Sequence, residues 1–226
     1  MQAFQKSLTR RYYFLNDESI SSRVASMART GRPRAFDIEQ ALVQARDLFW
    51  SQGYGATSIQ DLVDELDVQR GSLYAAFGDK RGLYLQAVAL YAQQNRDRLK
   101  SLVDADPVLP AIRQMLLEPA TLTGAPDLAN GDRRGCLLGN TAAELLPKDD
   151  AARELVAAAY QDTVQVLTTA LQRAQSNGEV ATNTTPAAQA QLLLLLFQGA
   201  ALVGRAQPDS EQLAAGIDAA IDALRA

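Results

Sequence analysis

The sequence contains no histidine and only one cysteine, Cys136. Without histidine, the chain cannot assemble a Ser-His-Asp or Cys-His catalytic site, a zinc finger or most transition-metal sites. A single cysteine also excludes a disulfide within the chain. We therefore expect no catalytic residues, no metal, no cofactor and no enzymatic activity.

Long hydrophobic runs are missing as well. The longest apolar segment, Leu192–Gly204, is interrupted by Gln198. It is shorter than the roughly 20 residues that a membrane-spanning helix needs, and it suits a buried helix better. Tyr12–Leu15 is too short for the core of a signal peptide. With one thiol and no export signal, we expect a cytoplasmic protein with no membrane partner.

The overall composition is that of a globular protein, with 47% hydrophobic and 21% charged residues and a net charge of −4. The charge is unevenly spread, because residues 1–36 carry a net charge of +5 and residues 83–226 a net charge of −5. This distribution excludes a uniformly basic nucleic-acid coat and leaves a local anion-binding end on an acidic body.

Residues 1–28 show no helical or strand period and include a second methionine, Met27. We expect them to be a disordered leader, or an upstream extension whose natural start is Met27. The alternative is an amphipathic targeting segment, which the acidic pair Asp17 and Glu18 disfavours.

From Phe36 onward the apolar residues follow a helical period, so the fold class is all-α with about nine helices. The first predicted helix runs from Asp37, as N-cap, to Gly53. Thr57 and Gln60 have the spacing of a capping box for a short second helix. A short third helix ends at Gly78, and Asp79 caps a long fourth helix; further helices are predicted at 108–122, 136–146, 149–176, 185–205 and 209–225.

The second and third helices are short and joined by a tight turn, which is typical of a helix-turn-helix. The third helix buries Leu73 and Phe77 and would expose a polar side that can lie in the major groove. Glutamine and arginine can contact base edges in pairs of hydrogen bonds, and a glycine lets the helix backbone approach DNA. The residues expected on this side are Gln69, Arg70, Gly71, Ser72 and Tyr74.

Two further positions indicate phosphate contacts. Thr57 and Ser58 lie at a predicted helix N-terminus, where free N–H groups bind phosphate well. Lys80 and Arg81 place positive charge in the first turn of the fourth helix, which opposes the helix dipole. A phosphate bound there would reverse that disadvantage.

Residues 45–88 resemble the DNA-binding domain of the tetracycline-repressor (TetR) family. The match is ungapped and includes Leu48-Phe49, Gly53, Thr57-Ser58-Ile59, Gly71-Ser72-Leu73-Tyr74, Phe77 and Lys80. Asp67 stands where many members have glycine, and aspartate can adopt the required turn conformation.

The resemblance implies a helix-turn-helix domain at 29–82, a larger helical effector-binding and dimerisation domain at 83–226, a homodimer, and repression of double-stranded operator DNA that an effector releases. It further implies that Tyr74 and Lys80 hold phosphates, that Thr57 anchors the second helix and that residues 69–72 read bases. Arg32 and Arg34 resemble the basic arm of many members, which could enter the minor groove.

The segment from Leu192 to Gly204 is apolar on all sides, so we expect it to be buried on every side. By the resemblance it pairs with a dimer mate in a four-helix bundle, and the alternative is an internal core helix of a monomer.

Cys136 lies in the segment Arg133–Asn140, where a loop meets a predicted helix start. Two adjacent arginines and a helix N-terminus would favour the reactive thiolate form. The Gly-Cys-Leu-Leu-Gly-Asn stretch resembles a branch of the family with electrophile- and oxidant-responsive members such as the N-ethylmaleimide-reductase repressor. One hypothesis is that Cys136 senses an electrophile or oxidant; the other is that it is a small buried side chain at a tight packing point.

The remaining questions concern the effector and the rival functions. Met115, Tyr160 and Phe197 could line an effector pocket or belong to the plain core. A helical ligand-binding protein of this fold without a DNA role is the alternative function, and competition between specific and random duplex DNA would distinguish the two.

Overall fold

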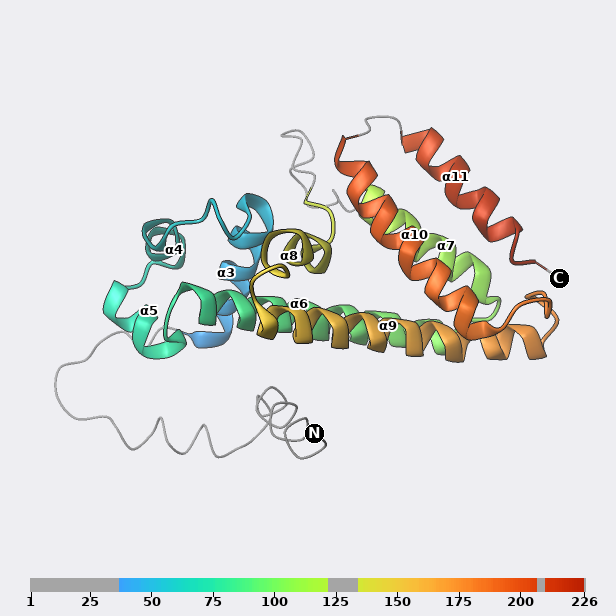
Figure 1. The fold of residues 1–226 in the computed structure, drawn as a ribbon, viewed down its shortest axis with the longest axis horizontal. Helices are drawn as coiled ribbons and strands as arrows, with labels where there is room; N and C mark the ends of the chain where they lie inside the picture. The colour runs from blue at the N-terminus through green and yellow to red at the C-terminus, as the bar shows by residue number, and fades with distance from the viewer. Residues whose placement is uncertain (1–36, 122–133, 207–209, 226) are drawn as a thin grey trace, which may run out of the picture. The chain divides into compact units, whose positions relative to one another are not determined.

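The computed structural model describes residues 37–121, 134–206 and 210–225, nearly all of which belong to one compact unit, Glu39–Ala226 (Figure 1). The predicted leader at 1–28 and the basic arm with Arg32 and Arg34 lie outside the described residues. Within the described part the chain forms nine helices and a single isolated bridge, which confirms the all-α prediction. The helices are α3 (Ile38–Gln52), α4 (Ile59–Leu66), α5 (Arg70–Phe77), α6 (Lys80–Asp104), α7 (Val108–Thr121), α8 (Leu137–Leu145), α9 (Asp150–Ser176), α10 (Pro186–Ala206) and α11 (Ser210–Asp222).

Local signals set the end of α3 as predicted. The N–H of Gly53 donates to the carbonyl oxygen of Phe49 at 2.8 Å, and Gly53 has a φ of 89°, a backbone conformation that favours glycine. Asp67, at the C-terminus of α4, adopts a left-handed φ of 48°. The aspartate therefore takes the turn conformation that was expected of it.

The predicted cap of α4 is wrong by one residue. Ser58, not Thr57, is the N-cap, and it forms a capping box with Asp61 rather than with Gln60. The Ser58 hydroxyl accepts from the Asp61 N–H at 3.1 Å, and the Asp61 carboxylate accepts from the Ser58 N–H at 2.7 Å. Thr57 is buried, and its hydroxyl donates to the Gly53 carbonyl at 2.7 Å, which closes the loop between α3 and α4.

Helices α5 and α6 follow the predicted signals. Leu73 and Phe77 are buried and hold α5 against its neighbours. The carboxylate of Asp79 accepts from the N–H of Gly82 at 2.6 Å and caps α6. Helix α6 is continuous across the boundary that the sequence placed between residues 82 and 83.

A hydrophobic core lies among α6, α7, α9, α10 and α11. Its buried side chains recur at spacings of three and four residues, with adjacent pairs between, as the 3.6-residue period requires. The carboxylate of Glu179 caps the first turn of α7. It accepts hydrogen bonds from the N–H groups of Val108 and Leu109 at 2.8 and 2.7 Å. The largest of these buried side chains include Leu109, Ile112, Leu116, Leu167, Leu171 and Leu193.

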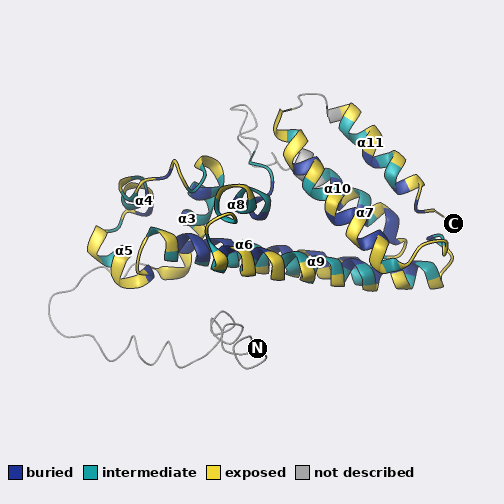
Figure 2. Ribbon diagram, viewed as in Figure 1, coloured by how far each residue is buried: buried dark blue, intermediate teal, exposed yellow. Residues whose placement is uncertain are grey.

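Helix α10 is not buried on every side within the single chain, which contradicts the alternative of an internal core helix of a monomer (Figure 2). Helices α7 and α9 pack against one side of it and bury residues such as Leu193 and Ala200. The other side carries exposed leucine and valine side chains at helical spacing: Leu192, Leu195, Leu202 and Val203, which are 49%, 60%, 68% and 45% exposed.

By length and composition, α10 is also the one described helix that could cross a membrane, with a mean hydropathy of 1.5 over its window. A core helix of a folded protein passes the same test. The packing of α10 against α7 and α9 accounts for its apolar character on the buried side.

Candidate functional site

Helix α5 presents the side that the sequence assigned to DNA. Gln69 is the N-cap residue of α5, and its exposed side chain makes no capping hydrogen bond. Arg70 and Gly71 are exposed, Ser72 is half-buried, and Tyr74 is 41% exposed although it is aromatic. No atom beyond the local backbone lies within 4 Å of a Cβ built on Gly71, so the surface there is open.

The N-terminus of α4 differs from the predicted phosphate site. The Thr57 side chain is buried in the turn, so it acts on the fold of the turn. Ser58 is exposed, but the Asp61 carboxylate already accepts its N–H. This hydrogen bond from the Ser58 backbone, together with the Ser58 hydroxyl, lowers the pKa of Asp61. The carboxylate of Asp61 therefore already places a negative charge at this helix end. A capping box between Thr57 and Gln60 would have left the helix N-terminus without this charge, which is why the sequence predicts a phosphate there.

The two cations at the start of α6 have different surroundings. The Lys80 ammonium lies 4.4 Å from the centre of the Tyr54 ring and is half-exposed. The Arg81 guanidinium donates two hydrogen bonds, of 2.6 and 2.7 Å, to the carboxylate of Asp149. The argument that stability would not select Arg81 is therefore wrong, because a carboxylate of the same chain pairs with it.

Asp149 joins the starts of two helices. It is the N-cap of α9, where it accepts from the N–H of Ala152 at 3.0 Å. Its side chain is only 10% exposed, while that of its partner Arg81 is 47% exposed. The hydrogen bond from Arg81 lowers the pKa of Asp149 to about 2. Asp149 therefore both caps α9 and pairs with the first turn of α6.

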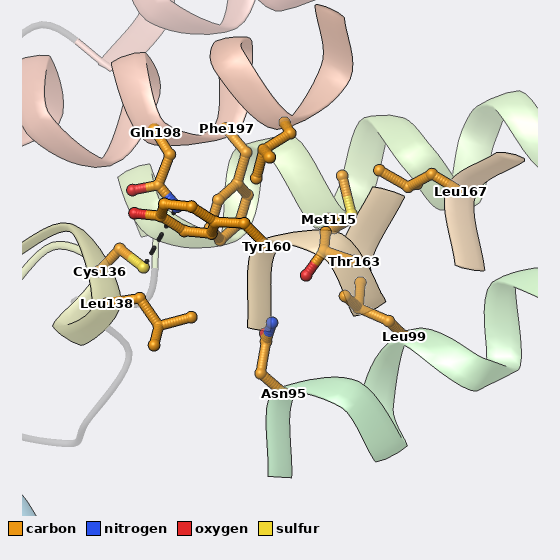
Figure 3. Close-up of a pocket in the computed structure, with 11 residues that line it drawn as sticks. Asn95, Leu99, Met115, Cys136, Leu138, Tyr160, Thr163, Leu167, Phe197 and Gln198 are labelled. Atoms are coloured by element: carbon orange, nitrogen blue, oxygen red, sulfur yellow. Dashed lines mark hydrogen bonds between the residues drawn. The ribbon is translucent and has the colours of Figure 1, made fainter. Parts of the chain in front are cut away.

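Cys136 lies at a cavity in the helical body (Figure 3). It is buried and is the N-cap residue of α8. The Gln198 amide donates to its sulfur at 3.5 Å, and the Tyr91 hydroxyl donates to it at 3.8 Å. Burial, with the neighbouring cysteine, raises the pKa of Tyr91 well above its ordinary value, so the hydroxyl stays protonated as a donor.

The cavity is small and its lining is uncharged. Its volume is about 10 Å³, comparable to the space that one water molecule needs. Met115, Tyr160 and Phe197, which the sequence left open between pocket and core, all line it. The lining residues are Asn95, Leu99, Met115, Cys136, Leu138, Tyr160, Thr163, Leu167, Leu194, Phe197 and Gln198.

The segment that leads into α8 contacts α3. The Trp50 indole N–H donates to the carbonyl oxygen of Gly135 at 3.1 Å, next to Cys136 in the chain. The Arg134 guanidinium lies 5.8 Å from the centre of the Trp50 ring, and the Tyr91 ring packs edge-on against that ring at 5.0 Å. The beginning of α8 therefore contacts both the cavity and α3.

The body and far end of α8 contact α6 and the loop between α3 and α4. The Thr141 hydroxyl shares a buried hydrogen bond of 2.9 Å with the Tyr84 hydroxyl. The Glu144 carboxylate accepts from the N–H of Gly55 at 3.0 Å. A Cβ added to Gly53 would lie 3.0 Å from the same carboxylate. The sequence gives no local signal for these contacts, since each joins residues more than 50 positions apart.

Two family models match this chain. Residues 41–87 match the model described as bacterial regulatory proteins, tetR family. Residues 128–221 match the model described as tetracyclin repressor-like, C-terminal domain. Together they cover most of α3, all of α4 and α5, the start of α6, all of α8, α9 and α10, and most of α11. The chain belongs to the tetracycline-repressor (TetR) family. It is therefore a DNA-binding transcriptional regulator.

Two HTH-type transcriptional regulators resemble half or more of the chain. It is 26% identical over 185 residues to the HTH-type transcriptional repressor ComR of Escherichia coli, covering 81% of this chain and 86% of ComR. It is 35% identical over 120 residues to the uncharacterised HTH-type regulator YezE of Bacillus subtilis. That match covers 53% of this chain and spans 60% of the length of YezE.

Solved TetR-family structures share the fold. The regulator CifR, in a cysteine mutant complexed with a 26 bp operator duplex, superposes with a TM-score of 0.72 at 28% identity, covering 86% of this chain and all of CifR. The reduced form of E. coli NemR superposes with a TM-score of 0.70, covering 82% of this chain and 96% of NemR. Its 21% identity supports the shared fold alone.

Proposed function

We propose that this TetR-family chain is a repressor that binds operator DNA as a homodimer and is released by an effector acting at the Cys136 cavity. The observation that carries the proposal is the exposed side of α5, where a base-reading pair, Gln69 and Arg70, adjoins the open backbone of Gly71. The helix-turn-helix places such a helix in the major groove, with its N-terminal residues against base edges. We assign residues 29–82 to the DNA-binding domain, residues 83–226 to the effector and dimerisation domain, and the protein to the cytoplasm.

The proposed DNA contacts have different functions. Gln69, Arg70 and Ser72 read bases, and Tyr74 and Lys80 hold phosphates. Thr57 acts through the turn in which it is buried, while Ser58 is exposed beside α4. Arg32 and Arg34, outside the described residues, belong to the arm that we propose enters the minor groove.

The exposed side of α10 supports the homodimer. Leucine side chains that are 60% and 68% exposed at positions 195 and 202 are two helical turns apart on one face. A contiguous apolar face of this kind marks an association surface. A two-fold dimer would place its two copies of α5 at half-sites about 34–36 Å apart on the duplex.

The Cys136 cavity is the proposed effector site, and α8 is the proposed link to the DNA-binding helices. An electrophile with an activated double bond would form a carbon–sulfur bond with Cys136, and the thiol proton would pass to the neighbouring carbon. The cavity has no room for that added group, so the start of α8 would have to move. Its contacts with Trp50 and the Gly55 loop would change with it. The Gly-Cys-Leu-Leu-Gly-Asn segment supports this proposal, because it resembles the branch of the family with electrophile- and oxidant-responsive members such as the N-ethylmaleimide-reductase repressor.

The test of DNA binding is a selection from a pool of random duplexes, followed by titration of the selected duplex against random competitor. We expect steep weakening with salt, as for any protein that neutralises several phosphates. Arg70→Ala should relax base preference, whereas Lys80→Ala should weaken binding to all duplexes about equally. Lys100→Ala, at an exposed lysine twenty residues further along α6 than Lys80, is the matched control and should change neither. A chain that selects no sequence would support the ligand-binding alternative without a DNA role.

The test of the effector site compares the wild-type chain with Cys136→Ser. Treatment with N-ethylmaleimide should release the wild-type chain from the selected duplex and leave the variant bound. Mass spectrometry should find one adduct, at Cys136. Equal release of both proteins would remove Cys136 from the mechanism and leave it as a packing residue of the cavity.

A further inference from the structure

A hydrogen bond joins the two helices of the helix-turn-helix at the candidate base-reading residue. The Arg70 guanidinium, at the first position of α5, donates to the side-chain oxygen of Gln60 on α4 at 3.2 Å. The Gln60 amide nitrogen in turn donates to the carboxylate of Asp64, one helical turn further along α4, at 2.8 Å. The three side chains form one chain of hydrogen bonds that ends at Arg70.

The two partners determine the orientation of the Gln60 amide. A guanidinium has only donors and a carboxylate only acceptors, so the amide must turn its oxygen to Arg70 and its nitrogen to Asp64. The opposite orientation would place donor against donor and acceptor against acceptor. Gln60 is therefore held by Asp64 in the orientation that accepts from Arg70.

Arg70 has no evident role in the stability of α5. A positive charge in the first turn opposes the helix dipole, and the side chain is exposed. A free arginine also has many rotamers, and ordering it on a base costs part of the binding free energy. The hydrogen bond to Gln60 uses one of the five N–H groups of the guanidinium and leaves the others for a base edge.

We propose that Gln60 is a positioning residue that sets base specificity: it holds the Arg70 guanidinium in place to donate to the two acceptors of a guanine. Guanine O6 and N7 together accept from an arginine in the major groove, which makes guanine the base that this geometry favours. The proposal rests on the proposed function, in which α5 enters the groove. It adds a residue of α4 to the determinants of the operator sequence.

The experiment is a selection from random duplexes with the full chain and three variants: Gln60→Met, Gln60→Glu and Arg70→Ala. Methionine keeps the length of the side chain and removes the acceptor. Gln60→Met should lower the preference for guanine at one base pair of each half-site by about two- to tenfold, the scale of one ordered side chain. Arg70→Ala should lower the preference at that same base pair.

Glutamate restores an acceptor for Arg70 but loses the donor to Asp64, so Gln60→Glu should keep more of the guanine preference than Gln60→Met. Its added negative charge should weaken binding to every duplex, and this weakening is separate from base preference. Gln93→Met is the matched control, because Gln93 donates to Asp97 one turn further along α6 in the same way, at 2.8 Å. This control should select the same sequence as the wild-type chain.

The outcomes separate this inference from the proposed function. If Arg70→Ala changes base preference and Gln60→Met does not, Arg70 reads its base without Gln60 and the inference is overturned. If Gln60→Met weakens binding to all duplexes equally and does not change base preference, Gln60 contacts the DNA phosphates, and the inference is also overturned. If no variant, Arg70→Ala included, changes any base preference, it is the assignment of α5 to base reading that fails. The double variant Gln60→Met/Arg70→Ala should lose no more guanine preference than Arg70→Ala alone. That result would support the inference, because both residues then act through one contact.

Discussion

The indole N–H of Trp50 donates to the carbonyl oxygen of Gly135, the residue immediately before Cys136. Trp50 lies on α3 and Cys136 is the N-cap of α8, so one hydrogen bond joins the cavity segment to the DNA-binding helices. Trp50 is also the only tryptophan of the chain, so its fluorescence is a specific reporter of this contact.

We expect alkylation of Cys136 by N-ethylmaleimide to shift the Trp50 emission to longer wavelength. The adduct does not fit a cavity of about 10 Å³, so the segment before α8 must move away from the indole and admit water. Fluorescence spectra taken together with intact-mass measurements would check this. Cys136→Ser should show no shift under the same treatment. An unchanged spectrum in fully alkylated protein would show that the contact does not respond to the thiol.

Gly71→Ala should change stability and DNA binding in opposite directions. A Cβ at Gly71 meets nothing within 4 Å in the free chain, and alanine is the better helix former, so unfolding should cost about 0.5–1 kcal/mol more. Where the helix backbone lies close to DNA, the same methyl group should weaken binding. Urea unfolding and duplex titration measure the two effects. A stabilised variant with wild-type affinity would mean that DNA does not approach the backbone at Gly71.

The fold followed from local signals where a single residue determines the backbone. Gly53 ends α3, Asp67 takes the left-handed turn, and Asp79 caps α6, all as predicted from residue type and spacing. The cap of α4 was missed because Thr57 and Ser58 both have the right side chain. The choice between them depends on Asp61, whose carboxylate competes successfully with Gln60 for the capping box.

The geometry of the candidate site was harder to predict than the helices. It depends on contacts between segments far apart in the chain, which the hydrophobic period of the sequence does not describe. The exposed side of α5 was predicted because Leu73 and Phe77 define its buried side. The pairing of Arg81 with Asp149 joins residues 68 positions apart, so no local pattern indicates it, and the first-turn position of Arg81 alone predicts a phosphate contact. The pattern of α10 is apolar all round, and such a pattern does not tell a face covered by the same chain from one that another protomer covers.

Asp149 should make the chain less stable in acid over a defined range. Its pKa is lowered to about 2 from an ordinary value of 3.8 by the hydrogen bond from Arg81. The ionised form is therefore favoured in the folded state, and its contribution is complete above about pH 4 and is lost as pH falls toward 2.

Asp149→Asn keeps a capping side chain and removes the charge. We expect it to lower the free energy of unfolding by about 1 kcal/mol near neutral pH, the upper range for a partly exposed pair. The difference from wild type should shrink between pH 4 and 2. Urea unfolding at a series of pH values measures it, with Asp150→Asn, at an 88% exposed neighbour, as control. A difference that stays constant down to pH 2 would contradict the role of the charge.

Leu195→Glu should separate the two protomers without unfolding either. Leu195 is 60% exposed in the single chain, so a carboxylate there costs little in the isolated fold but is buried unpaired in a dimer. Light scattering should give half the molar mass of the wild-type protein, with an unchanged helical circular-dichroism spectrum. Binding to a duplex with two half-sites should weaken by about 100-fold or more, because the second half-site contact is lost. Thr169→Glu, at an exposed position of α9, should leave mass and binding unchanged. A Leu195→Glu protein that keeps the wild-type mass would place the dimer contact elsewhere than on this face of α10.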